Sequence, residues 1–232
     1  MSSKKDYWNT YWNSRSTNEG NSPHLDIGRT INGVPIKKGE WIKTLDYIYK
    51  KLNLKSKDTV LDLCAGNGII SKEISKKCSK VTSVDFSEGL LEQIDVEEFK
   101  NIDVILADAR KVGFDNNHFD KIIFYFSIQH FTKAEVVSLF RKFYNWLKPG
   151  GILFVGDIPN SPKMWDFFNT YERKKVYFNS LESNAPIIGT WFDKLFFENL
   201  SYNLGFGKYV SLDQPNYQIN SHYRFDFISQ KI

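Results

Sequence analysis

One short stretch of the sequence combines an acidic residue with two glycines: Val60-Leu61-Asp62-Leu63-Cys64-Ala65-Gly66-Asn67-Gly68. Its apolar beginning predicts a buried strand, and its glycines let the backbone turn sharply and approach a ligand closely. The N–H groups that start the next helix have no partner within that helix and can face a polar ligand. The stretch therefore predicts a cofactor-binding loop, whose expected binding residues are Asp62, Cys64, Ala65, Gly66 and Gly68.

The spacing of these glycines separates two classes of cofactor. A dinucleotide fingerprint reads G-x-G-x-x-G, and the string from Cys64 to Ile70 lacks the third glycine at the required spacing. Asp62 also places a carboxylate where a pyrophosphate would be repelled. S-adenosylmethionine has no phosphate but carries a sulfonium and an ammonium group, which a carboxylate attracts. The loop therefore favours S-adenosylmethionine, with S-adenosylhomocysteine as the product, over NAD.

Two further carboxylates end the next two predicted strands. We expect Asp85, followed by Phe86 and Ser87, to accept hydrogen bonds from both ribose hydroxyls of the cofactor. We expect Asp108, followed by Ala109, to accept one from the adenine amino group. Each aspartate alone is equally well explained as a cap on the following helix. Three acidic residues at the ends of successive strands, together with the glycine loop, favour ligand binding.

Two residues are candidates for catalysis. His130 follows the fourth predicted strand and Asp157 ends the fifth, so either can act as a general base for an acceptor. The alternatives are a structural histidine in a loop and an aspartate that caps a helix. We expect no metal site.

The N-terminal region holds two further candidates for cofactor binding. Tyr11 belongs to an aromatic cluster with Tyr7, Trp8 and Trp12, which can close over a sulfonium or simply pack on the domain edge. Arg29 can pair with the methionine carboxylate of the cofactor or with an acidic substrate; otherwise it is an arginine of a surface loop.

The elements that position these residues alternate between strand and helix. Short apolar runs predict five strands, at Thr59–Leu63, Lys80–Asp85, Val104–Asp108, Phe119–Phe126 and Ile152–Asp157. Helices are expected at 7–12, Glu40–Leu52, Ile69–Cys78, Gly89–Phe99, Lys133–Leu147 and Trp191–Leu204, and two closing strands at Tyr209–Leu212 and Tyr223–Ile228. Near-continuous apolar strands between helices predict a parallel α/β sheet that is covered on both faces.

Over residues 57–158 the chain resembles the class I S-adenosylmethionine-dependent methyltransferases. The resemblance rests on the acidic-glycine loop at 62–68, on Asp85, on Asp108 and on the turn at 147–151, Leu-Lys-Pro-Gly-Gly. It implies a Rossmann-like, doubly wound sheet of seven strands, mostly parallel, with the last strand inserted antiparallel. Cys64 departs from the glycine that the fuller motif often has; because cysteine is small, we expect the loop geometry to survive.

We expect a single methyltransferase domain over 1–232, without a linker between separable cores. It comprises an N-terminal lid at 1–40, the cofactor-binding core at 57–158, an insert at 159–190 and the closing helix and strands at 191–232. The insert is rich in aromatic and basic residues, so we interpret it as a substrate cap. The alternative is an amphipathic helix that only packs against the domain.

The predicted reaction is methyl transfer to an oxygen or nitrogen of a small molecule, in glycan, lipid or secondary-metabolite tailoring. RNA or protein methylation is the first alternative, weakened because no basic domain is appended and 126–129 reads Phe-Ser-Ile-Gln rather than a tetrad like Asn-Pro-Pro-Tyr. The second alternative is a non-catalytic relative that binds the cofactor or a partner protein. The sequence leaves the oligomeric state open.

Composition limits the partners and the location. The net charge of +4 comes from 31 basic and 27 acidic residues, which predicts a solvated lysine-rich surface rather than a nucleic-acid footprint. No apolar run or leader-like segment predicts a membrane span or a signal peptide, and two cysteines fit a reducing compartment. We therefore expect a cytoplasmic protein. Enrichment in Lys, Asn, Ile, Phe and Tyr indicates an AT-rich, bacterial genome.

Overall fold

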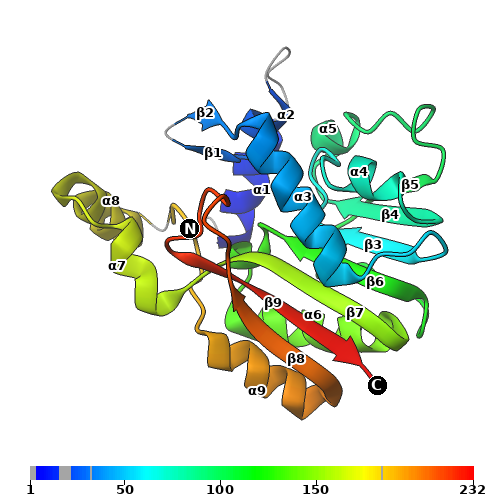
Figure 1. Ribbon diagram of the computed structural model, residues 1–232. Coiled ribbons are helices and arrows are strands. Elements are labelled where there is room, and N and C mark those ends of the chain that lie inside the picture. Colours follow the sequence, from blue (N-terminus) through cyan, green and yellow to red (C-terminus); the bar gives the residue numbers. More distant parts are fainter. Residues whose placement is uncertain (1–3, 16–21, 32, 184) are drawn as a thin grey trace.

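A seven-stranded sheet forms the centre of the computed structural model, which describes residues 4–15, 22–31, 33–183 and 185–232 (Figure 1). The strand order is β5-β4-β3-β6-β7-β9-β8; β3 to β7 run parallel, and β9 is antiparallel to both of its neighbours. The strands are β3 Thr59–Leu63, β4 Lys80–Asp85, β5 Ile102–Leu106, β6 Phe119–Tyr125, β7 Leu147–Pro159, β8 Phe206–Asp213 and β9 Arg224–Lys231. The predicted fold class, including the inserted antiparallel strand, is confirmed.

Helices cover both faces of this sheet and bury two apolar clusters against it. One cluster joins the sheet to α6 and α9, and the other joins it to α3 and α4. The helices are α1 Lys4–Arg15, α2 Pro23–Asp26, α3 Lys38–Leu52, α4 Ser71–Ser75, α5 Glu88–Leu91, α6 Lys133–Trp146, α7 Met164–Phe167, α8 Tyr171–Glu182 and α9 Lys194–Leu204. Short 3-10 turns η1 Ile128–His130 and η2 Ser161–Lys163, and a hairpin of β1 Thr30–Ile31 with β2 Val34–Pro35, complete the described elements.

Helix α6 illustrates how local sequence sets an element. Thr132 accepts a hydrogen bond from the Glu135 N–H, and the Glu135 carboxylate accepts one from the Thr132 N–H, which forms a capping box. Val136, Phe140 and Phe143 then recur on one side of the helix and are fully buried. The helix covers the sheet as the amphipathic pattern predicted.

Several predicted boundaries are wrong, including those of two helices and the third strand. The helix expected at Gly89–Phe99 ends at Leu91, because the Asp95 carboxylate accepts from the N–H groups of residues 97 and 98 and so competes with helical hydrogen bonds. The helix expected at Ile69–Cys78 is only Ser71–Ser75. The third strand lies at Ile102–Leu106 rather than at Val104–Asp108, because Ile102 pairs with Val81 in the register of β4. Asp108 therefore lies beyond the strand end.

The two segments outside the core differ in their placement. Residues 22–28 pack over the glycine loop, where the Asn67 side chain donates a hydrogen bond to the Pro23 carbonyl at 2.9 Å and Ile27 lies beside Gly66. The insert forms η2, α7 and α8, and Figure 1 shows α7 and α8 projecting to one side of the sheet. Residues 1–3, 16–21 and 32 of the expected lid, and residue 184 of the insert, lie outside the described residues. Within the described ranges, every helix is too short or too polar to cross a bilayer.

Candidate functional site

A cavity of about 340 Å³ lies at the carboxyl ends of β3, β4, β5 and β6. Ligands of open α/β sheets bind at this edge. Ten of the predicted site residues line it: Arg29, Asp62, Cys64, Ala65, Gly66, Asp85, Phe86, Asp108, Ala109 and His130. Four do not line it: Tyr11, Gly68, Ser87 and Asp157. The structure therefore gathers residues from 29 to 130 around one hollow.

Asp85 lines the cavity and also holds the glycine loop. One of its carboxylate oxygens accepts from the Gly66 N–H at 2.9 Å, and the other accepts from the Ser87 N–H at 2.9 Å. Burial raises the pKa of this carboxyl, although the two backbone N–H groups oppose the shift. The side chain thus combines the two roles that the sequence left open: it caps the following turn and faces the cavity.

Asp62 is buried at the start of the same loop. Its carboxylate accepts from the Ser71 hydroxyl at 2.6 Å, and Ser71 accepts in turn from the Ser83 hydroxyl at 2.7 Å. Burial raises the pKa of Asp62 to about 7, and the nearby charge of Asp85 adds to the rise. A cation in the cavity would favour the ionised form of this carboxyl.

Asp108 is paired with a neighbour that the sequence did not single out. The Arg110 side chain donates to both carboxylate oxygens of Asp108, at 2.9 and 3.2 Å, and reaches Glu135 at 3.4 Å. The Arg110 backbone N–H also donates to Asp108, at 2.9 Å, so this carboxylate is held in place where it lines the cavity. Arg110 lines the cavity beside Asp108 and is an additional candidate for ligand contact.

The loop backbone adopts the left-handed region at every second residue: Cys64 has φ 60°, Gly66 φ 56° and Gly68 φ 69°. A Cβ on Gly68 would lie 2.6 Å from a side-chain carbon of Ile94, so both conformation and space require glycine there. Cys64 keeps the conformation despite its Cβ, as expected from its small size.

This backbone makes a prediction for position 64. Cys64→Gly should change stability little, because relief of left-handed strain offsets the lost side-chain packing. Cys64→Val should destabilise the protein by about 1–2 kcal/mol more than Cys64→Gly, because a β-branched side chain tolerates positive φ poorly. Thermal unfolding of the two variants beside the parent measures the difference. Equal melting temperatures for the glycine and valine variants would contradict the strain argument.

Aromatic side chains of α1 close one wall of the cavity. Trp8 and Trp12 line it, and their rings lie 4.0 and 5.6 Å from the His130 ring, centroid to centroid. Tyr11 stacks on the outer side of this group against Arg15. The sequence indicated an aromatic cluster, but the residues that reach the cavity are the tryptophans rather than Tyr11.

His130 is enclosed by this wall. Burial lowers its pKa to about 3, and the positive charge of Arg224 contributes. Its Nδ1 is buried without a hydrogen-bond partner among the described residues. The imidazole is therefore neutral at pH 7 and a weak base in this state, which favours a role in shaping the cavity over one in proton abstraction.

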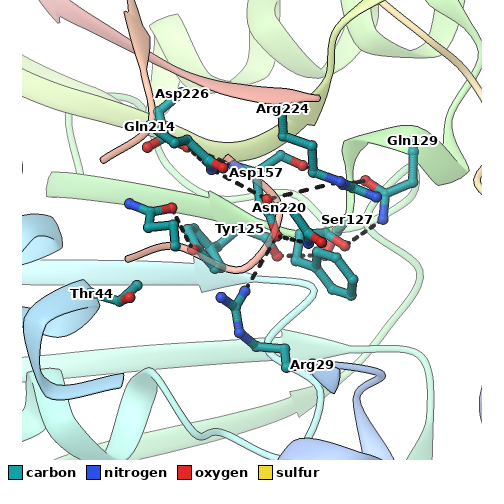
Figure 2. Close-up of polar contacts among 12 residues, drawn as sticks. Arg29, Thr44, Tyr125, Ser127, Gln129, Asp157, Gln214, Asn220, Arg224 and Asp226 are labelled. Atoms are coloured by element: carbon teal, nitrogen blue, oxygen red, sulfur yellow. Dashed lines mark hydrogen bonds and ion pairs between the residues drawn. The ribbon is translucent and has the colours of Figure 1, made fainter. Parts of the chain in front are cut away.

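A buried polar network lies behind the cavity wall (Figure 2). Arg29 is 1% exposed, so the alternative of a surface-loop arginine is wrong. Its guanidinium lies 3.4 Å from the Asp157 carboxylate and covers the rings of Tyr125 and Phe126, at 4.9 and 5.6 Å. Burial opposes the charge of Arg29, but these partners keep its pKa above the usual value.

The Asp157 carboxylate has hydrogen-bonding and ionic partners from distant parts of the chain. Its oxygens accept from Gln214 and Asn220, each at 3.2 Å, and lie 3.9 Å from the Arg224 guanidinium. Figure 2 shows these side chains converging on Asp157 from the segment that leads into β9. Asp157 (φ 63°), at a shift in the register of β7 against β9, and Phe126 (φ 58°), directly after β6, both have left-handed backbone, which is a strained conformation typical of functional sites. This placement favours a role for Asp157 in holding Arg29 rather than in touching an acceptor.

Comparison with known proteins finds methyltransferases among the proteins similar to this chain. A family model described as "Methyltransferase domain" matches residues 60–151. A demethylmenaquinone methyltransferase of Listeria welshimeri is 28% identical over 159 residues, which cover 64% of this chain and 62% of that protein. The ubiquinone/menaquinone biosynthesis C-methyltransferase of Coxiella burnetii is 29% identical over 118 residues, covering 47% of this chain and 46% of the relative. The chain therefore spans less than two thirds of the length of these relatives.

Solved structures share the fold. The Haemonchus contortus phosphoethanolamine N-methyltransferase 2, bound to phosphomonomethylethanolamine and S-adenosylhomocysteine, superposes with a TM-score of 0.70 at 15% identity. The match covers 99% of this chain and 60% of that one. The Pyrococcus horikoshii protein PH0226 gives a TM-score of 0.62 at 22% identity, over 84% of this chain and 91% of that one.

The sheet order and the cavity at its carboxyl edge define a Rossmann-like domain with a cavity against the glycine loop. The family-model match and the methyltransferase relatives support a class I S-adenosylmethionine-dependent methyltransferase. The fold expected from the sequence is confirmed.

Proposed function

We propose that this chain transfers a methyl group from S-adenosylmethionine to a small-molecule acceptor. The observation that carries the proposal is the cavity itself, in which the carboxylates of Asp62, Asp85 and Asp108 follow three neighbouring strands around one glycine loop. Three acidic side chains fit a cationic cofactor and disfavour a pyrophosphate. The family-model match and the methyltransferase names of the relatives support the same reaction.

When bound, S-adenosylmethionine supplies an electrophilic methyl group that the acceptor displaces in line. The chain's own contribution is to bind, orient and exclude water. Asp62 and Asp85 offset the cationic charges, and Trp8 and Trp12 cover the site and attract a sulfonium. Arg29, held by Asp157, presents a buried guanidinium to the cavity wall and can orient an ionised group of either ligand.

The first test is cofactor choice. Titration calorimetry with S-adenosylmethionine, S-adenosylhomocysteine and NAD should give micromolar dissociation constants for the first two and no heat for NAD. Methyl transfer from labelled cofactor into the small-molecule and the macromolecular fractions of a lysate then distinguishes the acceptor classes. Label confined to RNA or protein, or tight NAD binding, would refute the proposal.

The titration of Asp62 makes this binding pH-dependent. Because its pKa is about 7 in the free protein, Asp62 is largely protonated at pH 6, and a cationic ligand must release that proton. Affinity for S-adenosylmethionine should therefore rise by about fivefold between pH 6 and pH 7, reach about tenfold by pH 8 and level off above that. Asp62→Asn should flatten the profile in calorimetry; an unchanged slope in that variant would assign the proton to another group.

Two kinds of acceptor atom are candidates, namely an oxygen or nitrogen on the one hand and a carbon on the other. The sequence favoured an oxygen or nitrogen, whereas the relatives act on quinone precursors and one is named a C-methyltransferase. The aromatic lining of the cavity, which includes Trp8, Trp12, Tyr125, Phe126 and Phe131, suits a ring-bearing acceptor of either kind. Mass spectrometry of products from a panel of catechols, aromatic amines and demethylated quinols separates these outcomes.

The segment roles are part of the proposal. Trp8, Trp12 and Arg29 support a closing function for the described part of 1–40, because all three line the cavity. None of the described residues of the insert at 159–190 does so, and the projecting placement of α7 and α8 does not support a cap over this cavity.

A further inference from the structure

The insert carries an exposed apolar surface that the proposed reaction does not use. We call residues 161–183, which form η2, α7 and α8, the arm. None of the twelve residues of α8 is buried, although the helix contains two tyrosines, a phenylalanine, a valine and a leucine. Figure 1 shows the arm standing away from the sheet. A helix in water does not normally keep this much apolar surface without a partner.

Three of the exposed apolar residues of α8 share one side of the helix with Lys174, whereas Val176, also exposed, lies on the opposite side. Positions 171, 174, 178 and 181 follow the three- and four-residue spacing of a helical stripe. Tyr171 is 77%, Phe178 54% and Leu181 57% exposed. Trp165 of α7 is 46% exposed and its ring lies 6.4 Å from that of Phe178, so it extends the same surface. We call Trp165, Tyr171, Lys174, Phe178 and Leu181 the arm stripe.

The helix is attached to the domain by its other side. The Tyr177 ring packs on Phe168 at 4.8 Å and on Trp165 at 5.4 Å, and Arg173 donates to the Phe167 carbonyl at 2.9 Å. These contacts hold the helix by Arg173 and Tyr177 and leave Tyr171, Phe178 and Leu181 exposed. Trp165 of the arm stripe contacts the rings of both Tyr177 and Phe178. After the arm, Thr190 N–H donates to the Gln129 carbonyl at 2.8 Å, beside the cavity residue His130. The arm is thus anchored next to the wall of the cavity.

The charges on the arm favour one kind of partner. Lys174 lies within the stripe and Lys175 beside it; both are exposed, and neither forms an ion pair with any described residue. A second copy of the chain placed on the stripe would bury Lys174 of both copies in a surface whose own residues include no acidic side chain to pair with it. A bilayer with anionic headgroups would instead accept the ammonium groups while the aromatic and aliphatic side chains enter the interface.

We propose that the arm stripe docks this protein on the surface of an anionic lipid bilayer. The combination fits an interfacial helix: Trp and Tyr at the boundary, Phe and Leu reaching deeper, and lysines at the headgroups. This goes beyond methyl transfer and does not depend on it, since the surface lies outside the cofactor cavity.

Co-sedimentation with vesicles tests the proposal. The full chain should bind phosphatidylcholine vesicles that contain phosphatidylglycerol, and bind pure phosphatidylcholine vesicles at least about tenfold more weakly. Phe178→Asp should lower the partition onto the mixed vesicles by about tenfold or more. Val176→Asp is the matched control: it adds the same charge to the same helix at a residue that is 47% exposed but lies off the stripe, so it should bind better than Phe178→Asp.

A third variant changes the charge of the arm without changing its apolar side chains. Lys174→Glu with Lys175→Glu leaves the apolar side chains in place and should abolish the preference for phosphatidylglycerol. Circular dichroism of every variant checks folding. Absence of vesicle binding by the unaltered chain, or equal binding by the residue-178 and residue-176 variants, would overturn the proposal. So would a dimer in sedimentation velocity that Phe178→Asp dissociates, because the surface would then belong to a second copy.

Discussion

Asp85→Ala should weaken the binding of S-adenosylmethionine and S-adenosylhomocysteine by about 10- to 150-fold. The carboxylate is buried at the end of β4, faces the cavity and has acceptor sites left after its two backbone contacts. Loss of a charge-assisted contact to ribose hydroxyls costs roughly 1.5–3 kcal/mol, which corresponds to that range. Loss of the hydrogen bond that holds the Gly66 N–H should lower the affinity further. Titration calorimetry at pH 8 measures it.

The matched control is Asp103→Ala on the neighbouring strand. Asp103 is 54% exposed and pairs with Lys80 on the surface, so its loss should leave the dissociation constant unchanged. If Asp85→Ala lowers the melting temperature but binds the cofactor as tightly as the parent, Asp85 serves only to cap the turn.

Arg29→Met should lower the stability of the protein by about 3 kcal/mol. It removes one partner of a buried ion pair and leaves the Asp157 carboxylate with Arg224 at 3.9 Å and two amides. For a chain of this size the melting temperature should fall by roughly 6–12 °C. The size of this fall in melting temperature reflects the cost of leaving the Asp157 carboxylate without its ion-pair partner, in addition to the lost contact itself.

A double-mutant cycle isolates the pair. Arg29→Met combined with Asp157→Asn should recover at least about 1 kcal/mol relative to the sum of the single variants, because neither charge is then left alone. Arg141→Met, at an exposed position of α6, should stay within about 0.5 kcal/mol of the parent. Strict additivity of the two buried substitutions would mean that Arg29 and Asp157 act independently.

The cofactor side of the site was predictable because its signals are local. The acidic-glycine loop lies within seven residues, and Asp85 follows a strand whose bounds the apolar pattern gave correctly. Parallel strands bring their carboxyl ends to one edge, so three separate aspartates had to meet there. Asp108 was placed at the end of the third strand but lies just beyond Leu106, the last residue of β5, since an apolar run does not reveal the register in which a strand pairs.

The remaining wall was not predictable in the same way. Arg29 and Asp157 are separated by 128 positions, and Gln214, Asn220 and Arg224 join them only because β9 returns beside β7. No periodicity connects such residues. Likewise, an aromatic helix at the N-terminus has no sequence mark that tells which of its rings turns inward, so Tyr11 was chosen where Trp8 and Trp12 reach the cavity.

The inserted strand has a consequence for the order in which the chain can assemble. β9 follows β8 in the sequence but lies between β7 and β8, and β8 has no other neighbour in the sheet. During synthesis, residues 224–231 are the last part of the sheet to leave the ribosome. Until then, β7 has an unpaired edge and β8 has no strand to pair with. Exposed edges of this kind invite pairing with other nascent chains. The network around Asp157 closes in the same step, because Arg224 begins β9, so completion of the sheet and completion of the site are a single late event.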